Sequence, residues 1–183
     1  MIADPFSPFE TARLTLRCVA LEDAAGTSAL MTPEVSRWVA RWPMPFTRDM
    51  AVARIESARV QAFQGDALPL AIITKIDKEL IGWVVLSRDD LDNRRGSLGY
   101  WLGERYHGKG YMKEAAPVAL AAGFALLNLD VIESAAQPGN AGSFSVMQSC
   151  GMQRVGDGMV YAPARQQDEL CTFYEVKRLA AMR

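Results

Sequence analysis

The chain has 183 residues, of which 50% are hydrophobic and 22% charged, a balance typical of a soluble globular protein. Its 20 Lys and Arg residues nearly cancel its 21 Asp and Glu residues, leaving a net charge of −1. This charge gives no general attraction to nucleic acid or to an anionic membrane, so we expect neither as a partner. We expect a single domain over residues 1–183.

The first ten residues, MIADPFSPFE, carry acidic residues and prolines where a signal peptide needs a basic start and an apolar run. No segment reaches the ~20 apolar residues of a membrane span. The three cysteines, Cys18, Cys150 and Cys171, form no CxxC pair, and the chain has one histidine. We therefore expect reduced thiols, a cytoplasmic location and no metal site.

The first half of the chain begins with an alternating segment, residues 12–20, which predicts a half-buried strand. A helix should follow over residues 21–31, with Asp23 as its cap, and Thr32-Pro33 should open a short helix that continues to about residue 40. The next helix is expected over residues 48–64. Its buried face should consist of Met50, Val52, Ile55, Ala58, Val60 and Phe63.

The second half begins with two strands, residues 68–75 and 79–87, which a tight turn joins into a hairpin. A strand over residues 97–103 leads to a glycine-rich loop and a long helix over residues 111–129. A strand over residues 130–137, a short helix ended by Gly151, and two paired strands at residues 152–162 and 169–179 complete a mixed α/β fold. Because Pro117 lies inside the long helix, we expect a kink near Lys113 or a later helix start.

The glycine-rich loop fits neither of two familiar nucleotide-binding motifs. Gly103-x4-Gly108-Lys109 matches a Walker A motif until Gly110, where a Ser or Thr must hold Mg²⁺. In a GxGxxG reading the third glycine falls on Lys113, and the loop lies past mid-chain rather than after a first strand. A nucleoside triphosphatase and a dinucleotide-binding fold are therefore disfavoured.

A more general function survives for this loop. Where a strand enters a helix, several main-chain N–H groups lack partners, and glycines let a ligand approach them. The loop therefore suits a pyrophosphate, with Arg105 and Lys109 as outer charges. The alternative is a turn that only connects two elements.

Three stretches together resemble the GNAT family of N-acetyltransferases, and within it the RimJ/RimL-like branch. The first is Arg105-x-x-Gly108-x-Gly110, which is similar to the family's pyrophosphate loop. The second, residues 140–152, contains Asn140-x-x-Ser143 and a closing glycine, and the third is the opening strand and helix at residues 11–24. The order and spacing of all three match the family pattern.

The resemblance implies a mostly antiparallel twisted sheet, flanked by helices, with one splayed parallel strand pair that holds acetyl-CoA as co-substrate. Those two strands would be residues 97–103 and 130–136. The implied cofactor contacts are the main chain of Trp101, Leu102 and Gly103, the loop residues Arg105, Tyr106, His107, Gly108, Lys109, Gly110, Tyr111 and Met112, and the far-end residues Asn140 and Ser143.

The implied reaction is direct attack of an amine on the thioester. A main-chain N–H near Trp101 would polarise the carbonyl. Many family members protonate the departing thiolate with a tyrosine at the position of Met147, which has no proton to give. In the RimJ/RimL-like branch this role is given to the serine of Asn-x-x-Ser, and Ser143 occupies that position. It would act as a hydrogen-bond donor to the sulfur. The alternative is that the Ser143 hydroxyl caps its own helix.

The general base is not evident from the sequence. Ser97 stands where relatives often carry a glutamate, and Asp89 and Asp90 are the nearest acids, with a solvated acidic turn as their alternative role. An α-amine has a pKa near ~8 and needs less help than a lysine, which favours an α-amine acceptor. We interpret His107 as part of the loop's packing or a phosphate neighbour, because its place in the loop is away from the thioester.

The acceptor, a protein N-terminus or a small-molecule amine, would meet an aromatic cluster of Trp38, Trp42, Met44 and Phe46, with Asp89 nearby. Ordinary packing of this loop onto the core is the alternative. The sequence also leaves open an acyl-CoA-binding protein without turnover, acting as a sensor or structural partner. Dimers are common in the family, so we expect a homodimer, although no residue of this sequence indicates one.

Overall fold

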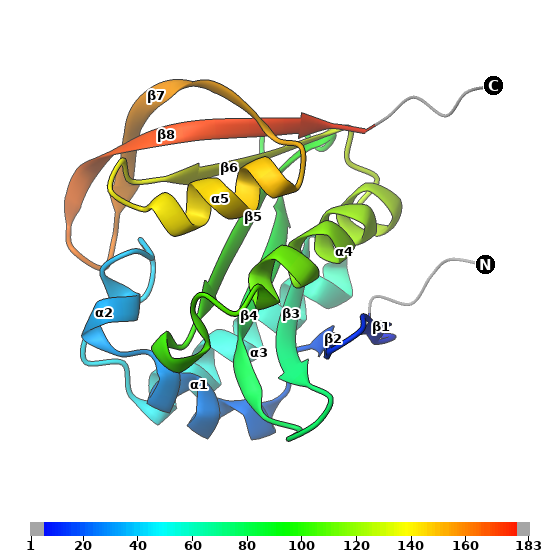
Figure 1. The fold of residues 1–183 in the computed structure, drawn as a ribbon, viewed down its shortest axis with the longest axis vertical. Coiled ribbons are helices and arrows are strands. Elements are labelled where there is room, and N and C mark those ends of the chain that lie inside the picture. The colour runs from blue at the N-terminus through cyan, green and yellow to red at the C-terminus, as the bar shows by residue number, and fades with distance from the viewer. Residues whose placement is uncertain (1–5, 179–183) are drawn as a thin grey trace.

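The computed structural model describes residues 6–178. Within them, eight strands form one sheet in the order β1-β2-β3-β4-β5-β6-β8-β7, and helices cover both faces (Figure 1). Neighbouring strands run antiparallel except β5 and β6, which are parallel. The predicted mixed α/β class, with its one parallel pair, is confirmed.

The first half of the sheet matches the predicted hairpin and its neighbours. Five strands build it: β1 Phe9–Glu10, β2 Leu14–Cys18, β3 Ala67–Thr74, β4 Leu80–Arg88 and β5 Arg95–Leu102. A bulge between Ile72 and Ile73 shifts the register near the end of the β3–β4 hairpin. The apolar residues of these strands alternate between the two faces, so that each face carries a hydrophobic core of its own.

The helices before β3 lie on one face of the sheet. They are the single turn η1 Leu21–Asp23, then α1 Ala24–Leu30, α2 Pro33–Ser36 and α3 Arg48–Gln64. Thr32 caps α2 as predicted, but α2 ends at Ser36 instead of residue 40. The predicted cap role of Asp23 is confirmed at the helix entry, where its carboxylate accepts from the N–H of Ala20, the N-cap of η1. The same carboxylate is held by Arg17 at 2.7 and 2.8 Å and caps no N–H of α1.

Helix α3 has the predicted bounds, but part of its predicted buried face is wrong. Ala51, Ile55 and Ala62 are buried. Of the predicted face, Met50, Val60 and Phe63 are instead 37%, 56% and 83% exposed. Spacings of four and seven residues keep the buried three on one stripe of a 3.6-residue helix, and Val60 and Phe63 fall outside that stripe.

Helices α4 Tyr111–Leu126 and α5 Ala141–Ser149 lie on the opposite face (Figure 1). Small residues let α4 approach the sheet closely: Ala115, Ala116 and Ala119 are fully buried, and Gly123 lies against Leu86 and Ile132. The helix begins at Tyr111 with Pro117 inside it, so the alternative of a later start is wrong. No helix within residues 6–178 has the length and apolarity needed to cross a bilayer.

The C-terminal half of the sheet contains β6 Val131–Ala136, β7 Gln153–Ala162 and β8 Gln167–Lys177. The predicted pairing of the last two strands is confirmed, and residue 179, the predicted end of the second, lies outside the described residues. Gly151, with φ 75°, ends α5 in the left-handed conformation as predicted. Strand β6 joins the two halves of the sheet through its parallel pairing with β5.

Candidate functional site

A cleft of about 1910 Å³ opens where β5 and β6 part. In the described chain the two strands pair at three positions, Arg95–Val131, Gly96–Ile132 and Ser97–Glu133, and then diverge. Beyond this point side-chain hydrogen bonds replace the main-chain ladder. The Ser134 hydroxyl donates to the carbonyl of Leu98 at 2.8 Å, and the Tyr100 hydroxyl donates to the carbonyl of Ser143 at 3.1 Å. The main chain of β5 is thereby left with an edge that faces the cleft.

Main-chain hydrogen bonds at the two ends of β5 show which of its residues face that edge. The N–H of Gly103 donates to the carbonyl of Ile81 in β4, whereas the carbonyl of Arg94 accepts from the N–H of Val131 at the start of β6. Main-chain groups alternate in direction along a strand. Odd-numbered residues of β5 therefore direct their N–H and carbonyl groups to β4, and even-numbered residues direct theirs to the cleft.

This alternation corrects the expected role of Trp101. The register pairs Trp101 with Trp83 of β4, which places its N–H in the sheet. The main-chain donors that face the cleft belong to its neighbours Tyr100 and Leu102. The carbonyl of Leu102 is already occupied, because Nε2 of His107 donates to it at 2.8 Å and ties the glycine loop to the end of β5.

The glycine loop leaves a continuous run of donors at one end of the cleft. Gly108 and Gly110 have φ of 71° and 77°, a conformation that glycine adopts at little cost. The six N–H groups of residues 108–113 have no acceptor among the described residues; the first paired N–H of α4 is that of Glu114, which donates to the carbonyl of Gly110. A Cβ at Gly108 would meet no atom within 4 Å, so there is room beside it for an anion.

The expected outer charges of the loop are directed differently. Arg105 lies 3.6 Å from Glu79 and over the ring of Tyr106, whose hydroxyl donates to Glu79 at 2.7 Å. Lys109 Nζ lies 5.8 Å from the same ring. In this structure the exposed Arg105 side chain is therefore paired with Glu79.

Arg13 is a cation at the loop that sequence reasoning missed. It donates to the carboxylate of Glu114 at 2.7 Å and to the carbonyl of Lys109 at 3.0 Å, and it stacks on Tyr111. Burial would raise the pKa of Glu114, but hydrogen bonds from Thr11 and Arg13 outweigh it and lower that pKa. Arg13 is 96 residues from Lys109, and no local pattern links them.

Helix α5 brings Ser143 to the cleft. The side chain of Asn140 caps this helix by accepting from the N–H of Ser143 at 3.1 Å. The Ser143 hydroxyl lines the cleft and makes no hydrogen bond to its own helix among the described residues, so the alternative in which it caps that helix is not seen. Met147 is fully buried. The Tyr100 hydroxyl lies beside Ser143, and burial raises its pKa well above the ordinary value.

The tryptophan cluster divides between packing and the cleft. Trp42 is 8% exposed and packs on three rings, those of Phe46, Trp83 and Trp101, at centroid distances of 4.9, 5.2 and 5.2 Å. The packing alternative therefore describes Trp42 and Phe46, although Trp42 also lines the cleft. Trp38 is half-buried, lines the cleft, and lies 3.5 Å from where a Cβ on Gly139 would be.

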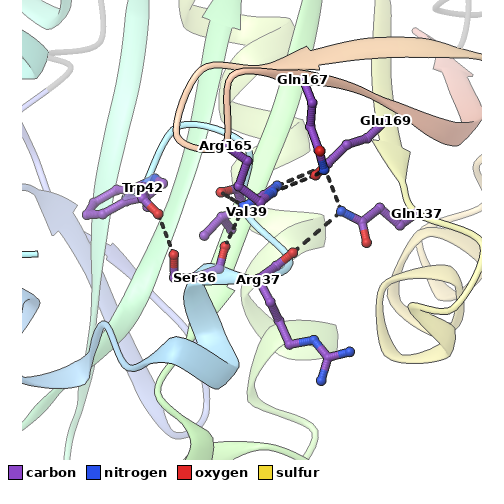
Figure 2. A network of polar contacts seen from close by, with 8 residues as sticks. All are labelled: Ser36, Arg37, Val39, Trp42, Gln137, Arg165, Gln167 and Glu169. Atoms are coloured by element: carbon purple, nitrogen blue, oxygen red, sulfur yellow. Dashed lines mark hydrogen bonds and ion pairs between the residues drawn. The ribbon is translucent and has the colours of Figure 1, made fainter. Parts of the chain in front are cut away.

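A polar network, named here the Arg165 clamp, holds the segment after α2 against the end of the β7–β8 hairpin (Figure 2). Arg165 donates to Glu169 at 2.5 and 2.8 Å and to the carbonyls of Ser36 and Val39 at 3.0 and 3.4 Å. Gln137 donates to Glu169 at 2.7 Å. The Arg165 guanidinium lowers the pKa of Glu169 to about 2. Sequence reasoning missed this clamp.

Four acids line the cleft among the described residues: Asp89, Asp90, Glu133 and Glu169. Asp89 Oδ1 accepts from the N–H groups of Leu91 and Asp92 at 2.8 and 3.1 Å, which makes it part of the turn, as its alternative role anticipated. Glu133, which sequence reasoning missed, lies beside Ser97 in the register. Within residues 6–178 no three His, Cys, Asp or Glu side chains are grouped to hold a metal.

Comparison with known families gives one clear match. Residues 13–153 match the model of the acetyltransferase (GNAT) domain. The chain is also 36% identical, over 149 residues, to the uncharacterised N-acetyltransferase p20 of Bacillus licheniformis, which covers 80% of this chain and 82% of that protein.

Solved structures share the fold at lower identity. A ribosomal-protein-S5-alanine acetyltransferase from Vibrio fischeri has a TM-score of 0.81 and 23% identity, covering 93% of this chain and 96% of that one. RimJ of Mycobacterium smegmatis, in complex with CoA-disulfide, has a TM-score of 0.80 and 21% identity, covering 93% and 86%.

Proposed function

Because the chain belongs to the GNAT acetyltransferase family, we propose that it is an N-acetyltransferase that moves an acetyl group from acetyl-CoA to a primary amine by direct attack. The observation that carries the proposal is the run of six unbonded N–H groups at one end of a cleft between two parting strands. Such a run suits a pyrophosphate. The parted strands suit an extended ligand that adds to the free edge of β5.

The residues of this chain fit acetyl-CoA, which supplies the acetyl group as an activated thioester. The N–H groups of residues 108–113 would bind the pyrophosphate, with Lys109 close by and Arg13 holding the loop in place. Arg105 would add charge from the loop's start. The pantetheine arm would lie along the cleft-facing groups of Tyr100 and Leu102, and Asn140 and Ser143 would lie at its far end.

Two groups would act on the reacting atoms. The N–H of Tyr100 is directed to the cleft and would donate to the thioester carbonyl, the role that the sequence suggested for the N–H near Trp101. The Ser143 hydroxyl lines the cleft and would donate to the sulfur as the thiolate leaves. Met147 is buried and offers no competing proton.

The acceptor would bind beside Trp38, against the wall that the Arg165 clamp builds from the segment after α2 and the β7–β8 turn. We favour a protein α-amine, since an α-amine loses its proton more easily than a lysine. The fold-related S5-alanine acetyltransferase acts on a ribosomal protein, as its name says, which supports the same class. The free cysteines, Cys18, Cys150 and Cys171, suit a cytoplasmic location. The homodimer stays a prediction.

The test is CoA release from acetyl-CoA, followed as free thiol, with two groups of acceptors. Peptides with free N-termini form one group, and polyamines, amino acids and aminoglycosides form the other. Turnover on peptides would support a protein N-terminal acetyltransferase, and turnover on small amines alone would make this a metabolite-modifying or drug-modifying enzyme. Acetyl-CoA binding without turnover on any amine would contradict the proposal and favour the acyl-CoA-binding alternative.

A further inference from the structure

Glu133 lies where the two parallel strands part. It pairs with Ser97 in the last step of the β5–β6 ladder, and paired residues share a face of the sheet. That face is the one on which Trp101 packs with residues of α3, because Ser97 and Trp101 are both odd-numbered on β5. The Glu133 side chain also lines the cleft. It therefore stands at the inner end of the cleft, on the side from which the acceptor would come.

The Glu133 carboxylate is poorly compensated. Its one ion pair within residues 6–178 is a 3.9 Å contact with Arg95, whose guanidinium binds Glu175 of β8 at the shorter distance of 2.7 Å. No hydrogen bond reaches the Glu133 carboxylate in the same part of the chain. Burial raises the pKa of Glu133, Arg95 acts in the opposite direction, and Glu175 and Asp89 raise it further. Lys177 lies 3.8 Å from Glu175.

The other three acidic residues of the cleft are less suited to accept a proton, because each is either held by hydrogen bonds or exposed in a turn. Glu169 is held by two bonds from Arg165, which lower its pKa to about 2, so it is a poor proton acceptor. Asp89 accepts two N–H groups of its own turn. Asp90 is exposed in the same turn. Glu133 alone among the four combines partial burial, a carboxylate that accepts no hydrogen bond within residues 6–178, and a place on the cleft wall.

We propose that Glu133 accepts the proton of the acceptor's ammonium group, an inference that rests on the proposed function. The ammonium gives one proton to the Glu133 carboxylate, and the neutral nitrogen forms its bond to the carbonyl carbon. As the C–S bond breaks, the second nitrogen proton passes to the Ser143 hydroxyl, which gives its own proton to the thiolate. Glu133 then returns its proton to solvent, so that ammonium and thioester become amide, thiol and one proton.

The test compares Glu133→Gln with wild type over pH 6 to 10, on a peptide that the wild type acetylates. At pH 7 we expect kcat/KM to fall about 100-fold, because a positioned base contributes this much or more. The loss should shrink to a few-fold above the acceptor's own pKa of ~8, where the free amine needs no base. Acetyl-CoA affinity, measured by calorimetry, should not change. Glu56→Gln, on the exposed side of α3, controls for loss of one negative charge.

A second readout needs no turnover. Carboxyl carbon NMR of the free protein should show one glutamate that titrates above the ordinary ~4.3 and disappears in Glu133→Gln. Equal activity of Glu133→Gln and wild type at every pH would overturn the role of Glu133 and leave the proposed function standing. The same pH signature in Asp89→Asn or Asp90→Asn, in place of Glu133→Gln, would also overturn it. A wild type without turnover on any amine would overturn both proposals.

Discussion

The two ends of the cleft are built in different ways. At the cofactor end, the donors come from six consecutive residues, 108–113, and two left-handed glycines set their direction. At the acceptor end, the wall joins α2, β6 and the β7–β8 turn, and Arg165 reaches residues more than 120 positions away. One end is a local conformation of the chain, and the other exists only in the folded protein.

This difference determines how each end should respond to mutation. A local site fails when a single residue blocks its ligand, while the fold around it survives. An assembled site fails when a contact between its parts is lost, so its failure should carry a cost in stability.

Gly108→Asp should weaken acetyl-CoA binding about 1000-fold, because a carboxylate in the space beside Gly108 would oppose the pyrophosphate. Calorimetry with acetyl-CoA measures the loss. Gly65→Asp is a matched control: Gly65 also has a positive φ, 78°, and open space, but it ends α3 away from the cleft. Both variants should lose similar stability, and only the first should lose affinity. Unaltered affinity in Gly108→Asp would contradict the site.

Ser143→Ala should lower kcat about 100-fold with acetyl-CoA affinity kept, since a hydrogen bond to the leaving sulfur would act mainly in the transition state. Steady-state kinetics on the preferred acceptor measures the effect. Ser149→Ala removes another hydroxyl of α5, one that donates to its own helix at Val146, and should leave kcat unchanged. Full activity of Ser143→Ala would remove Ser143 from the mechanism.

Arg165→Ala should raise the KM for the acceptor about tenfold and destabilise the protein by about 3 kcal/mol, because Glu169 would be left largely buried without its partner. Acetyl-CoA affinity should stay as in wild type. Arg154→Ala breaks an exposed pair with Asp157 in the same hairpin, which should cost less than about 1 kcal/mol and leave KM unchanged. A loss of acetyl-CoA affinity in Arg165→Ala would mean that the two ends are not independent.

Acid should act on the clamp only far below neutral pH. The pKa of Glu169 is lowered from 4.5 to about 2, so its contribution to stability is full above pH 4.5 and is lost as the pH falls through about 2. The difference in unfolding free energy between wild type and Glu169→Gln should therefore be constant from pH 7 to 5 and should shrink below. Denaturant unfolding at several pH values measures it. A difference that already shrinks at pH 6 would contradict the bonding of Glu169 by Arg165.

The same contrast explains what the sequence could predict. The bounds of α3, the β3–β4 hairpin, the cap on α2 and the glycine loop follow from local patterns, and the structure contains them. Arg13, Glu133 and the clamp depend on strand register or on contacts across the fold, which a single sequence does not display. The misplaced N–H at Trp101 has the same cause, because the direction of a main-chain group depends on which neighbour the strand pairs with.

The short parallel ladder between β5 and β6 has a mechanical consequence. Three residue pairs in the described chain connect a five-stranded half of the sheet to a three-stranded half, so this seam should be the first place where the sheet opens. A ligand lying along the free edge of β5 would supply hydrogen bonds to main-chain groups of β5 that the seam lacks. Bound acetyl-CoA at 100 times its dissociation constant would add about 2.7 kcal/mol to the free energy of unfolding. Amide hydrogen exchange along β5 and β6 would then slow more than in the other strands, because the bound substrate would connect the two halves of the sheet.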